Sequence, residues 1–563
     1  MKTRILTFTA LAFLAASASS WAATINVNST NDILSSGDGA CTLREAVINA
    51  NNDAATYSDC TAGSGADTVE LSAGVYCLDI AGSGEDAGLT GDLDINSDMT
   101  ITGVDSASTI IDGGDRPSGT GLITTCANDL NDRIFDIIAS TSAHNVAMQN
   151  LAVMGGDSTS NGGGIRAEDN NLDLDHVAIS GNQAAYSGGL YLGPVYFSTS
   201  LNITDSAISD NVSTGGIGGI SISAAASAIL TRVSITNNLA TSTVGGLNIA
   251  LDSMTEIYDS TISGNEAYYA SGINILTNSE VVIVNSTISN NADSSDYLYG
   301  GVIYANDSKL VLENSTVSGN SETAIVSAST NADVQLNNVT VANNDVTYGA
   351  LLSHDPLYFG VSNSIITANV NSSGTELDCS GDITSLGYNF IPSASCTYSA
   401  TTGDITDGLN INLDVLADNG GETETMALLS GSAAIDAGNC SLTTDQRGLA
   451  RDATCDIGAY EYGAVENLPP VADAGADKRI NRAVKPLAKL KGFLSYDPEG
   501  ELLTFAWTVT TVPSGSSITH SDIYQRTTPA ASVLLDSHGT YIFTLTVTDP
   551  AGNSDSDDVT IKY

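Results

Sequence analysis

The sequence has few basic residues and no long hydrophobic run after its N-terminus. Only 18 residues of 563 are Lys or Arg, against 65 Asp or Glu, and the formal net charge is −47. Nucleic acid and anionic membrane surfaces would repel so acidic a chain, so both are excluded as partners. Beyond the N-terminus no segment approaches the roughly 18 apolar residues that span a bilayer. We therefore expect a soluble mature chain with no membrane span and no C-terminal anchor.

Basic residues are scarcest in the middle of the chain. Between Ala139 and Asn369 only Arg166, Arg232 and Lys309 occur. Proteins that bind uronate polymers pair the carboxylates of the ligand with Arg or Lys. The scarcity therefore disfavours an anionic polysaccharide, and the acidic excess is typical of a protein that stays soluble in a saline exterior.

A sustained helical periodicity is also missing. Apolar residues instead alternate with polar ones at period two, which is the spacing of strands. The alternating pairs are Leu172 and Leu174, Leu201 and Ile203, Val281 and Ile283, Leu310 and Leu312, and Val334 and Leu336. Gly-Gly pairs recur between these runs and predict a turn that needs positive φ or a close backbone approach.

One phrase, ending in Ser-x-Asn in most copies, returns about every 27 residues. The steps between its final asparagines are 29, 27, 27, 26, 29, 24 and 25 residues, and Asp157 stands one step earlier in the same phase. Such a period of strand-forming units predicts a solenoid, here an all-β, right-handed parallel β-helix of the pectin-lyase-like type. Stacked amides can bond along its axis. We predict a structural ladder of Asn182, Asn211, Asn238, Asn265, Asn291, Asn320, Asn344 and Asn369.

The N-terminus and the cysteines both indicate export. Lys2 and Arg4 precede an apolar run and a small-residue exit near Ala22, which predicts a signal peptide over residues 1–22. Eight cysteines in an oxidising compartment predict four disulfides, although 105 pairings are possible. We expect the local pairs Cys41–Cys60, Cys379–Cys396 and Cys440–Cys455, which leave Cys77 with Cys126.

Two sets of motifs flank the repeats. Residues 41–52 read Cys-Thr-Leu-Arg-Glu-Ala-Val-Ile-Asn-Ala-Asn-Asn, a short helix suited to cap the open end of a solenoid. This segment resembles the Cys-(Ser/Thr)-Leu-Arg-Glu-Ala motif of bacterial exported β-helix proteins. Residues 416–423, 431–438, 445–448 and 455–461 are similar to the terminal region of the choice-of-anchor Q surface proteins. These resemblances imply a cap and first coils over 23–135 and an anchor-Q-like region over 376–463, and the periodic phrase places the repeats over 136–375.

The pattern changes after residue 463. Residues 464–470, with Pro469 and Pro470, predict a stiff linker. Residues 471–563 resemble a PKD-type, immunoglobulin-like sandwich with Trp507 and Tyr541 in its core. Six basic residues fall within 478–491, and they form either a solvated strand face or a docking patch for an acidic or anionic surface: Lys478, Arg479, Arg482, Lys485, Lys489 and Lys491.

Catalytic motifs are not found. Within residues 136–375 the Asn-Thr-Asp, Asp-Asp, Gly-His-Gly and Arg-Ile-Lys segments of polygalacturonase-like enzymes are missing, and no acidic cluster is in phase with the basic residues. We therefore expect no cofactor and no metal site, with calcium possible but unsupported by a specific motif. Asp205 and Asp259 share a turn position and indicate turn capping. We align His176 with Ser206 of the following repeat and interpret it as a surface turn residue.

Tyrosines recur in one loop of the repeat. Equal phase in a solenoid means one face, and aligned rings can stack on sugars while their hydroxyls bond to them. The predicted glycan-binding row is Tyr186, Tyr268, Tyr269, Tyr297, Tyr299 and Tyr348.

Together these observations predict a secreted or cell-surface β-helix protein that is not an enzyme and that is adhesin-like or glycan-binding. The expected partner is an extracellular polysaccharide or the surface of a host or neighbouring cell. The alternative is a carbohydrate-active enzyme, a polysaccharide lyase or glycoside hydrolase of the same fold. A purely structural role as a spacer is a third interpretation.

Overall fold

The structure is a computed structural model that describes residues 22–115, 117, 126, 128–138, 142–193, 196, 199–293, 300–407, 409–465, 468–481, 486–498, 500, 502–550 and 552–563. The expected signal peptide therefore lies almost wholly outside the described residues. The chain forms two compact units, Met1–Gly463 and Ala464–Tyr563. This division coincides with the start of the expected linker.

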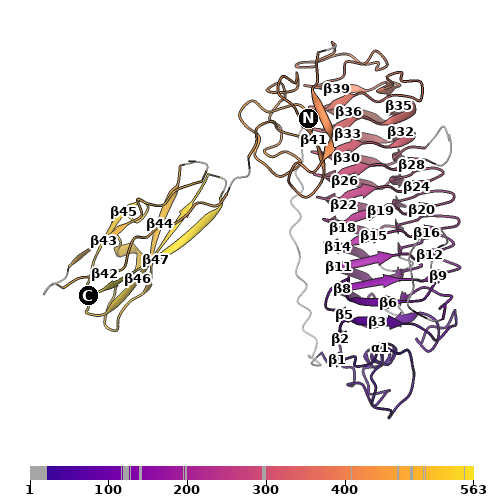
Figure 1. The fold of residues 1–563 in the computed structure, drawn as a ribbon, viewed down its shortest axis with the longest axis horizontal. Helices are drawn as coiled ribbons and strands as arrows, with labels where there is room; N and C mark the ends of the chain where they lie inside the picture. Colours follow the sequence, from indigo (N-terminus) through magenta and orange to yellow (C-terminus); the bar gives the residue numbers. More distant parts are fainter. Residues whose placement is uncertain are drawn as a thin grey trace. The chain divides into compact units, whose positions relative to one another are not determined.

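Unit 1 is a parallel β-helix, as the repeat predicts. Its strands form one sheet of 22 strands, here called sheet A, and one of 17 strands, sheet B. In Figure 1 the strands stack coil upon coil along one axis. Each strand pairs in parallel with the strand of the next coil, so neighbouring coils lie about 4.8 Å apart.

Sheet A receives two strands from each coil. In β8 (Asn145–Met154) and β11 (Asn171–Ser180) the two are continuous. The first strands of the later coils are β14 (Ser200–Thr204), β18 (Ser227–Thr231), β22 (Met254–Tyr258), β26 (Glu280–Val284), β30 (Lys309–Glu313), β33 (Asp333–Asn337) and β36 (Tyr358–Ser362). The second strands are β15 (Ala207–Ser209), β19 (Ser234–Thr236), β23 (Thr261–Ser263), β27 (Thr287–Ser289), β31 (Thr316–Ser318), β34 (Thr340–Ala342) and β37 (Ile365–Thr367). The ends of the sheet are β1 (Thr24–Asn26), β2 (Asp67–Glu70), β3 (Gly74–Cys77), β5 (Met99–Thr102), β6 (Thr109–Asp112) and β39 (Thr384–Gly387).

Sheet B closes each coil. Its short strands are β9 (Asp157–Ser158), β12 (Gln183–Ala184), β16 (Val212–Ser213), β20 (Leu239–Ala240), β24 (Glu266–Ala267) and β28 (Ala292–Asp293). Its longer strands are β4 (Leu93–Ile95), β7 (Phe135–Ile138), β10 (Ile165–Glu168), β13 (Leu190–Gly193), β17 (Ile220–Ser223), β21 (Leu247–Ala250), β25 (Ile273–Leu276) and β29 (Ile303–Asn306). The last coils contribute β32 (Ser321–Ala328), β35 (Asp345–Ser353) and β38 (Cys379–Ser380).

The core is a column of aliphatic side chains inside the coils. In β26, for example, Val281 and Ile283 are 0% exposed while the residues between and beside them are half-buried. Each fully buried Val, Ile or Leu contributes about 1.5 to 3 kcal/mol relative to an exposed one. The period-two pattern in the sequence therefore reflects which side chains face this column.

The asparagines that end each repeat are buried and bonded to one another. Asn265 is representative: its Nδ2 donates to Asn291 Oδ1 at 2.9 Å and to the carbonyl of Ile235 at 2.9 Å. Its Oδ1 accepts from the backbone N and from Nδ2 of Asn238, both at 3.0 Å. Both donors and both lone pairs of the amide are thus used. Side-chain bonds of the same kind link Asn182, Asn211, Asn238, Asn265, Asn291, Asn320, Asn344 and Asn369.

Different groups end this ladder. At the C-terminal end Asn369 Nδ2 donates to Asp378 Oδ1 at 2.8 Å. At the N-terminal end the backbone N–H of Gly156 donates to Asn182 Oδ1 at 3.0 Å. The phase assigned to Asp157 is therefore wrong by one residue, because Asp157 pairs with Gln183, which follows the ladder position.

A second column of residues makes the turn between the two strands of sheet A. These residues have positive φ and are mostly Asn or Asp, the non-glycine types that tolerate this conformation best. The column contains His176, Asp205, Arg232, Asp259, Asn285, Asn314, Asn338 and Asn363. The interpretation that His176 matches Ser206 is wrong, because the N–H of Val177 donates to Ser206 Oγ at 2.9 Å, which aligns Val177 with Ser206.

The glycine pairs are required for close approach rather than for positive φ. A Cβ built on Gly218 would lie 2.7 Å from the carbonyl oxygen of Gly245 in the next coil, and one on Gly246 would lie 2.5 Å from that of Gly272. Any side chain here would push neighbouring coils apart.

The N-terminal end is closed by α1 (Leu43–Asn51), whose residues Leu43 to Ala50 are all buried. Thr42 and Glu45 form a capping box. Arg44 uses all five donors, two on Asp32 at 2.7 and 2.9 Å and three on the carbonyls of Gly88, Gly91 and Asp92. Among the described residues no helix is long and apolar enough to cross a bilayer.

Four disulfides fasten the two ends of unit 1. They join Cys41 to Cys60, Cys77 to Cys126, Cys379 to Cys396 and Cys440 to Cys455. Such a set of structural disulfides is typical of an extracellular protein.

Unit 2 is a β-sandwich. One sheet consists of β42 (Lys478–Arg479), β47 (Ser554–Lys562), β46 (Thr540–Thr548) and β44 (Thr504–Thr511), and the other of β43 (Leu487–Lys491) and β45 (Ala530–Leu534). Trp507 and Tyr541 are both 0% exposed, and the Tyr541 hydroxyl donates to the carbonyl of Ser537. Arg482 and Lys485 of the basic stretch lie outside the described residues.

Replacing Asn265 with Leu should lower the free energy of unfolding by about 1 to 3 kcal/mol, because the amides of Asn238 and Asn291 each lose a buried partner. Thermal unfolding followed by circular dichroism measures this. The control is Asn202→Leu, an exposed strand position, which should change stability by less than about 0.5 kcal/mol. Equal midpoints for the two variants would show that the ladder adds nothing to stability.

Candidate functional site

The outward face of the second strands of sheet A is lined by small residues. Ala178, Ala207, Ser234 and Thr261 follow one another in register, one per coil, and all are at least partly exposed. Their inward neighbours, such as Ile235 and Ile262, are at most 1% exposed. Because small side chains leave room above the sheet, this floor forms a pocket, here called the open trough.

In the later coils the same column is covered by the chain itself. The next floor residues, Thr287, Thr316, Thr340 and Ile365, are at most 1% exposed. The cover is residues 413–461, here called the C-terminal segment, which includes β40 (Leu413–Ala417) and β41 (Thr425–Leu428). The open trough is therefore the uncovered part of a longer groove.

Side chains of the groove bind the C-terminal segment through polar groups. Gln446 is the main contact: its Nε2 lies 2.9 Å from Thr287 Oγ1, and its Oε1 accepts from Thr316 Oγ1 at 2.6 Å. Asn314 Nδ2 donates to the carbonyl of Thr444 at 2.9 Å, and Thr340 Oγ1 accepts from the N–H of Ala459 at 3.1 Å. The groove thus already holds hydrogen-bonding segments of the chain itself.

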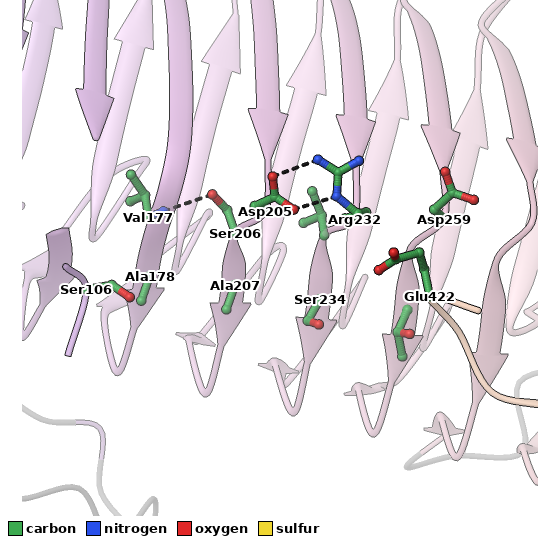
Figure 2. Close-up of a pocket in the computed structure, with 12 residues that line it drawn as sticks. Ser106, Val177, Ala178, Asp205, Ser206, Ala207, Arg232, Ser234, Asp259 and Glu422 are labelled. Atoms are coloured by element: carbon green, nitrogen blue, oxygen red, sulfur yellow. Dashed lines mark hydrogen bonds and ion pairs between the residues drawn. The ribbon is translucent and has the colours of Figure 1, made fainter. Parts of the chain in front are cut away.

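Charged residues of the turn column form one wall of the open trough. Figure 2 shows Asp205, Arg232 and Asp259 in a row above the floor, with Glu422 of the C-terminal segment in the same pocket. Arg232 binds Asp205 through two parallel bonds of 2.5 and 2.7 Å, and this hydrogen bonding lowers the pKa of the Asp205 carboxyl. Arg232 keeps a positive φ of 53°, an uncommon conformation for such a residue.

The wall continues to His176. Its Nδ1 lies 2.7 Å from Asp175 Oδ1, and ligand atoms of Asp175, His176 and Asp205 all lie within 4.8 Å of one another. The His176 side chain is 57% exposed. His176 is thus a surface turn residue, as the sequence predicts. It belongs to the turn column and aligns with Asp205 instead of Ser206.

Each basic residue of the repeats is paired with a carboxylate of the preceding coil. Arg166 binds Asp136, Arg232 binds Asp205, and Lys309 binds Glu280. With Asp175, Asp259 and Glu422 also nearby, the wall of the open trough is predominantly acidic. This charge disfavours an anionic ligand there.

The tyrosine row is interrupted. Tyr186 and Tyr269 share one register position, but Gly216 and Thr243 occupy it in the two coils between them. Tyr186, Tyr268 and Tyr348 are exposed, at 59, 45 and 42%. These three recur every third coil, a spacing of about 14 Å at a rise of about 4.8 Å per coil. Tyr297 and Tyr299 lie outside the described residues.

Tyr269 packs against a residue that the sequence did not single out. Its ring lies edge-on to that of Tyr304, with centroids 5.1 Å apart, over Val244 and Ala270. Tyr304 is 3% exposed and faces outward from sheet B beside Tyr348. Tyr304 occupies a regular outward position of β29, opposite Asn274 of the preceding coil, so its place could have been predicted from the repeat. The loop of different length before β29 obscured this alignment in the sequence.

The expectation of no acidic cluster in phase with the basic residues is wrong. Asp94 and Asp136 are opposite each other in register, and Arg166 follows on the next coil. Arg133 Nη1 lies 3.2 Å from Asp92 Oδ2 and 2.6 Å from Asp136 Oδ2. The repeat pattern does not predict this cluster, because Arg133 and Asp92 are 41 residues apart and this separation does not match the period of the repeat.

Burial dominates the electrostatics of this cluster. Asp92, Asp94 and Asp136 are at most 2% exposed. Removal from water raises the pKa of Asp92 to about 8 and that of Asp94 to about 7, and neighbouring aspartates contribute to both increases. A polymer in solvent cannot reach carboxylates buried so fully.

Glu322 is a further buried carboxyl that the sequence did not indicate. It occupies an inward position that Ala267 holds in an earlier coil, and it is 4% exposed. Ser271 Oγ donates to its Oε2 at 2.6 Å. Burial, and then the nearby charge of Asp293, raise the Glu322 pKa well above its usual value.

Comparisons with known proteins support the two folds. Residues 218–390 match the family model described as right handed beta helix region, and residues 474–562 match a family model described as a PKD domain. No curated protein matches the chain. The β-helix is thus right-handed, and unit 2 is a PKD domain.

Two solved structures are similar over short stretches. One is a nucleoside hydrolase-related hypothetical protein from Saccharophagus degradans, associated with carbohydrate metabolism; it is 22% identical over 19% of this chain and 28% of its own, with a TM-score of 0.16. The other is the PKD domain from the KIAA 1837 protein, 28% identical over 18% of this chain and 90% of its own, with a TM-score of 0.14. The matched part thus spans little more than a quarter of the Saccharophagus protein.

Replacing Glu322 with Gln should stabilise the protein increasingly as pH rises. The folded-state pKa is raised, so the native glutamic acid binds its proton more tightly than the unfolded chain does, and wild-type stability falls as pH rises above about 4.5. The amide carries no such penalty, and each tenfold difference in proton affinity corresponds to about 1.4 kcal/mol. Thermal midpoints of both proteins should agree near pH 4.5 and diverge by pH 8.

The matched control is Glu266→Gln, an exposed glutamate on β24, which should leave the pH profile unchanged. A Glu322→Gln variant that is less stable than wild type at pH 8 would show that the carboxylate is ionised and needed.

Proposed function

We propose that this chain is an exported, adhesin-like protein that binds an extended, uncharged glycan in the open trough. The observation that carries the proposal is the contrast along one groove. Thr287 and Thr316 are covered by the C-terminal segment, whereas Ser234 and Thr261 at the same register are not. The open floor offers hydroxyl groups and room to an extended polymer.

Charge selects the class of ligand. The carboxylates that line the open trough, those of Asp205, Asp259 and Glu422, repel uronates and sulfated polymers, and Arg232 is occupied by Asp205. A neutral polysaccharide presents hydroxyls, which can donate to these carboxylates in charge-assisted hydrogen bonds. Neutral glycans therefore fit the open trough better than anionic ones.

Export is the second part of the proposal. The apolar leader, the four disulfides and the resemblance of both ends of unit 1 to exported β-helix proteins and choice-of-anchor Q surface proteins support it. The PKD domain then serves as a spacer or an additional binding module on a surface-located or secreted chain.

The exposed tyrosines are a second candidate surface. Tyr186 and Tyr268 present rings on the loops beside sheet B, and Tyr348 presents its ring from β35. Each ring could stack on one sugar at a gain of about 1 kcal/mol. Their three-coil spacing means that a bound glycan would touch tyrosine only at intervals. The acidic wall on sheet A runs through consecutive coils, which favours the open trough.

A carbohydrate-active enzyme is the alternative function. An acid, a base and an arginine do converge at Asp92, Asp94, Asp136 and Arg133, and perturbed carboxyl groups are typical of catalytic sites. Their burial, at 0 to 9% exposure, separates them from any polymer on the surface, which favours binding over catalysis.

A panel of immobilised polysaccharides tests the proposal, with neutral chains set against pectate and alginate as anionic controls. The wild type should be retained on a neutral polymer without releasing new reducing ends. Ser234→Trp fills the open trough and should weaken retention at least tenfold. Asn202→Trp, on an exposed strand position outside the trough, should bind like the wild type.

A triple variant, Tyr186→Ala, Tyr268→Ala and Tyr348→Ala, separates the two surfaces and should bind normally. Loss of binding in the triple variant, with retention in Ser234→Trp, would move the site to the tyrosines. Release of reducing ends by the wild type would establish the enzyme instead. Failure to retain the wild type on any polysaccharide would refute a glycan-binding function.

A further inference from the structure

Three buried aspartates meet on the first coils of sheet B. Asp94 lies on β4 and Asp136 opposite it on β7, while Asp92 directly precedes β4. One carboxylate oxygen from each lies within 4.8 Å of the other two. Three oxygens with these separations leave at least one position within about 2.8 Å of all three. This is close to the roughly 2.3 to 2.6 Å of calcium–oxygen bonds, so a small contraction would satisfy the ion.

Asp94 has an oxygen that the described part of the chain does not use. Its Oδ2 accepts from the N–H of Gly88 at 2.7 Å, but its Oδ1 has no hydrogen-bond partner among the described residues, although Asp94 is 0% exposed. Leaving a buried carboxylate oxygen unpaired is costly, and such oxygens in native proteins usually have a partner. Asp136, in contrast, accepts from both Arg133 and Arg166. Among the described residues, Asp92 and Asp136 each pair with an arginine, whereas Asp94 does not. The unpaired oxygen, Oδ1 of Asp94, therefore belongs to the carboxylate without an arginine partner.

The carboxyl groups of the cluster outnumber the guanidinium groups that face them. Asp92, Asp94, Asp132 and Asp136 are all at most 5% exposed, and in the described part of the chain two guanidinium groups, Arg133 and Arg166, face them. Glu168, Glu85 and Asp86 add negative charge at the margin. If the four carboxylates are ionised, two negative charges are left over, which is the charge that one divalent cation neutralises. Burying that excess without a counter-ion would be expensive.

We propose that Asp92, Asp94 and Asp136 bind one calcium ion inside the first coils of the solenoid. An all-oxygen donor set selects a hard cation, and calcium accepts the irregular geometry of side chains from different coils better than magnesium does. Extracellular modules bind calcium in the range of about 0.1 to 1 mM, which suits an exported protein.

The ion would join the N-terminal cap to the solenoid. Arg44 of α1 already holds the carbonyls of Gly88, Gly91 and Asp92, so the 88–92 turn lies between the helix and the aspartates. A cation bound to Asp92 and Asp94 would fix the other side of this turn. Its removal should therefore loosen the cap before the repeats.

The test uses the full mature chain, freed of metal with a chelator and titrated with calcium by calorimetry and thermal unfolding. The wild type should bind one ion per chain with a dissociation constant below about 1 mM, and its thermal midpoint should rise. Asp94→Asn keeps the size of the side chain but removes its charge, and it should weaken binding at least tenfold. Asp92→Asn repeats the test if the first variant fails to fold.

Asp175→Asn is the matched control, because Asp175 belongs to the exposed Asp175, His176 and Asp205 group, which could also attract a cation. This variant should bind calcium like the wild type. The proposal would be overturned if the wild type bound no calcium. It would also be overturned if binding survived Asp94→Asn and Asp92→Asn, or if it were lost in Asp175→Asn, which would place the ion at the exposed group.

Discussion

The stacking of one asparagine amide per coil is the constraint on which the solenoid depends. Each amide bonds both to the coil before it and to the coil after it, as Asn265 does with Asn238 and Asn291. A slip of one residue would remove the amide from the ladder and turn the aliphatic residues of the strand outward. Loops of different length can therefore be tolerated between ladder positions, because register is set by the amides and the core together.

Regular coils make grooves that side chains then modify. The floor of the trough exists because Ala178, Ala207 and Ser234 are small, and its wall exists because one turn residue per coil has positive φ. Arg232 takes a turn position that suits Asn or Asp better, and it gains two bonds to Asp205 in return. Function on this fold thus depends on outward positions, which the core does not restrict.

The sequence predicted the parts of the fold that repeat. The Asn period and the alternating Leu, Ile and Val residues are enough to predict parallel strands, because each coil packs the same kinds of side chain against its neighbours. The PKD domain was predictable from its motifs, and Trp507 and Tyr541 are in its core as expected. The register of His176 was missed by one residue, since period-two patterns cannot show which residue of a turn has positive φ.

The candidate sites were harder to predict, because they join segments with no common period. The aspartate cluster joins residues 41 positions apart in irregular first coils, and Gln446 reaches Ser286 across 160 residues. Sequence separations of this size cannot be detected from the local pattern of apolar and polar residues. The tyrosine row was visible only as equal phase, and the register shows that Gly216 and Thr243 interrupt it.

The C-terminal segment has a consequence for how such a protein can evolve. Its contacts with Asn285, Asn314, Asn338 and Asn363 tie it to particular coils, so a coil inserted or deleted among them would leave it mismatched in length. Within the described residues, the coils before Thr261 carry no hydrogen bond of this kind. Duplication or loss of a whole coil there would keep the ladder intact and change only the length of the open trough. Natural variation in the length of this protein should therefore accumulate in the coils that form the open trough.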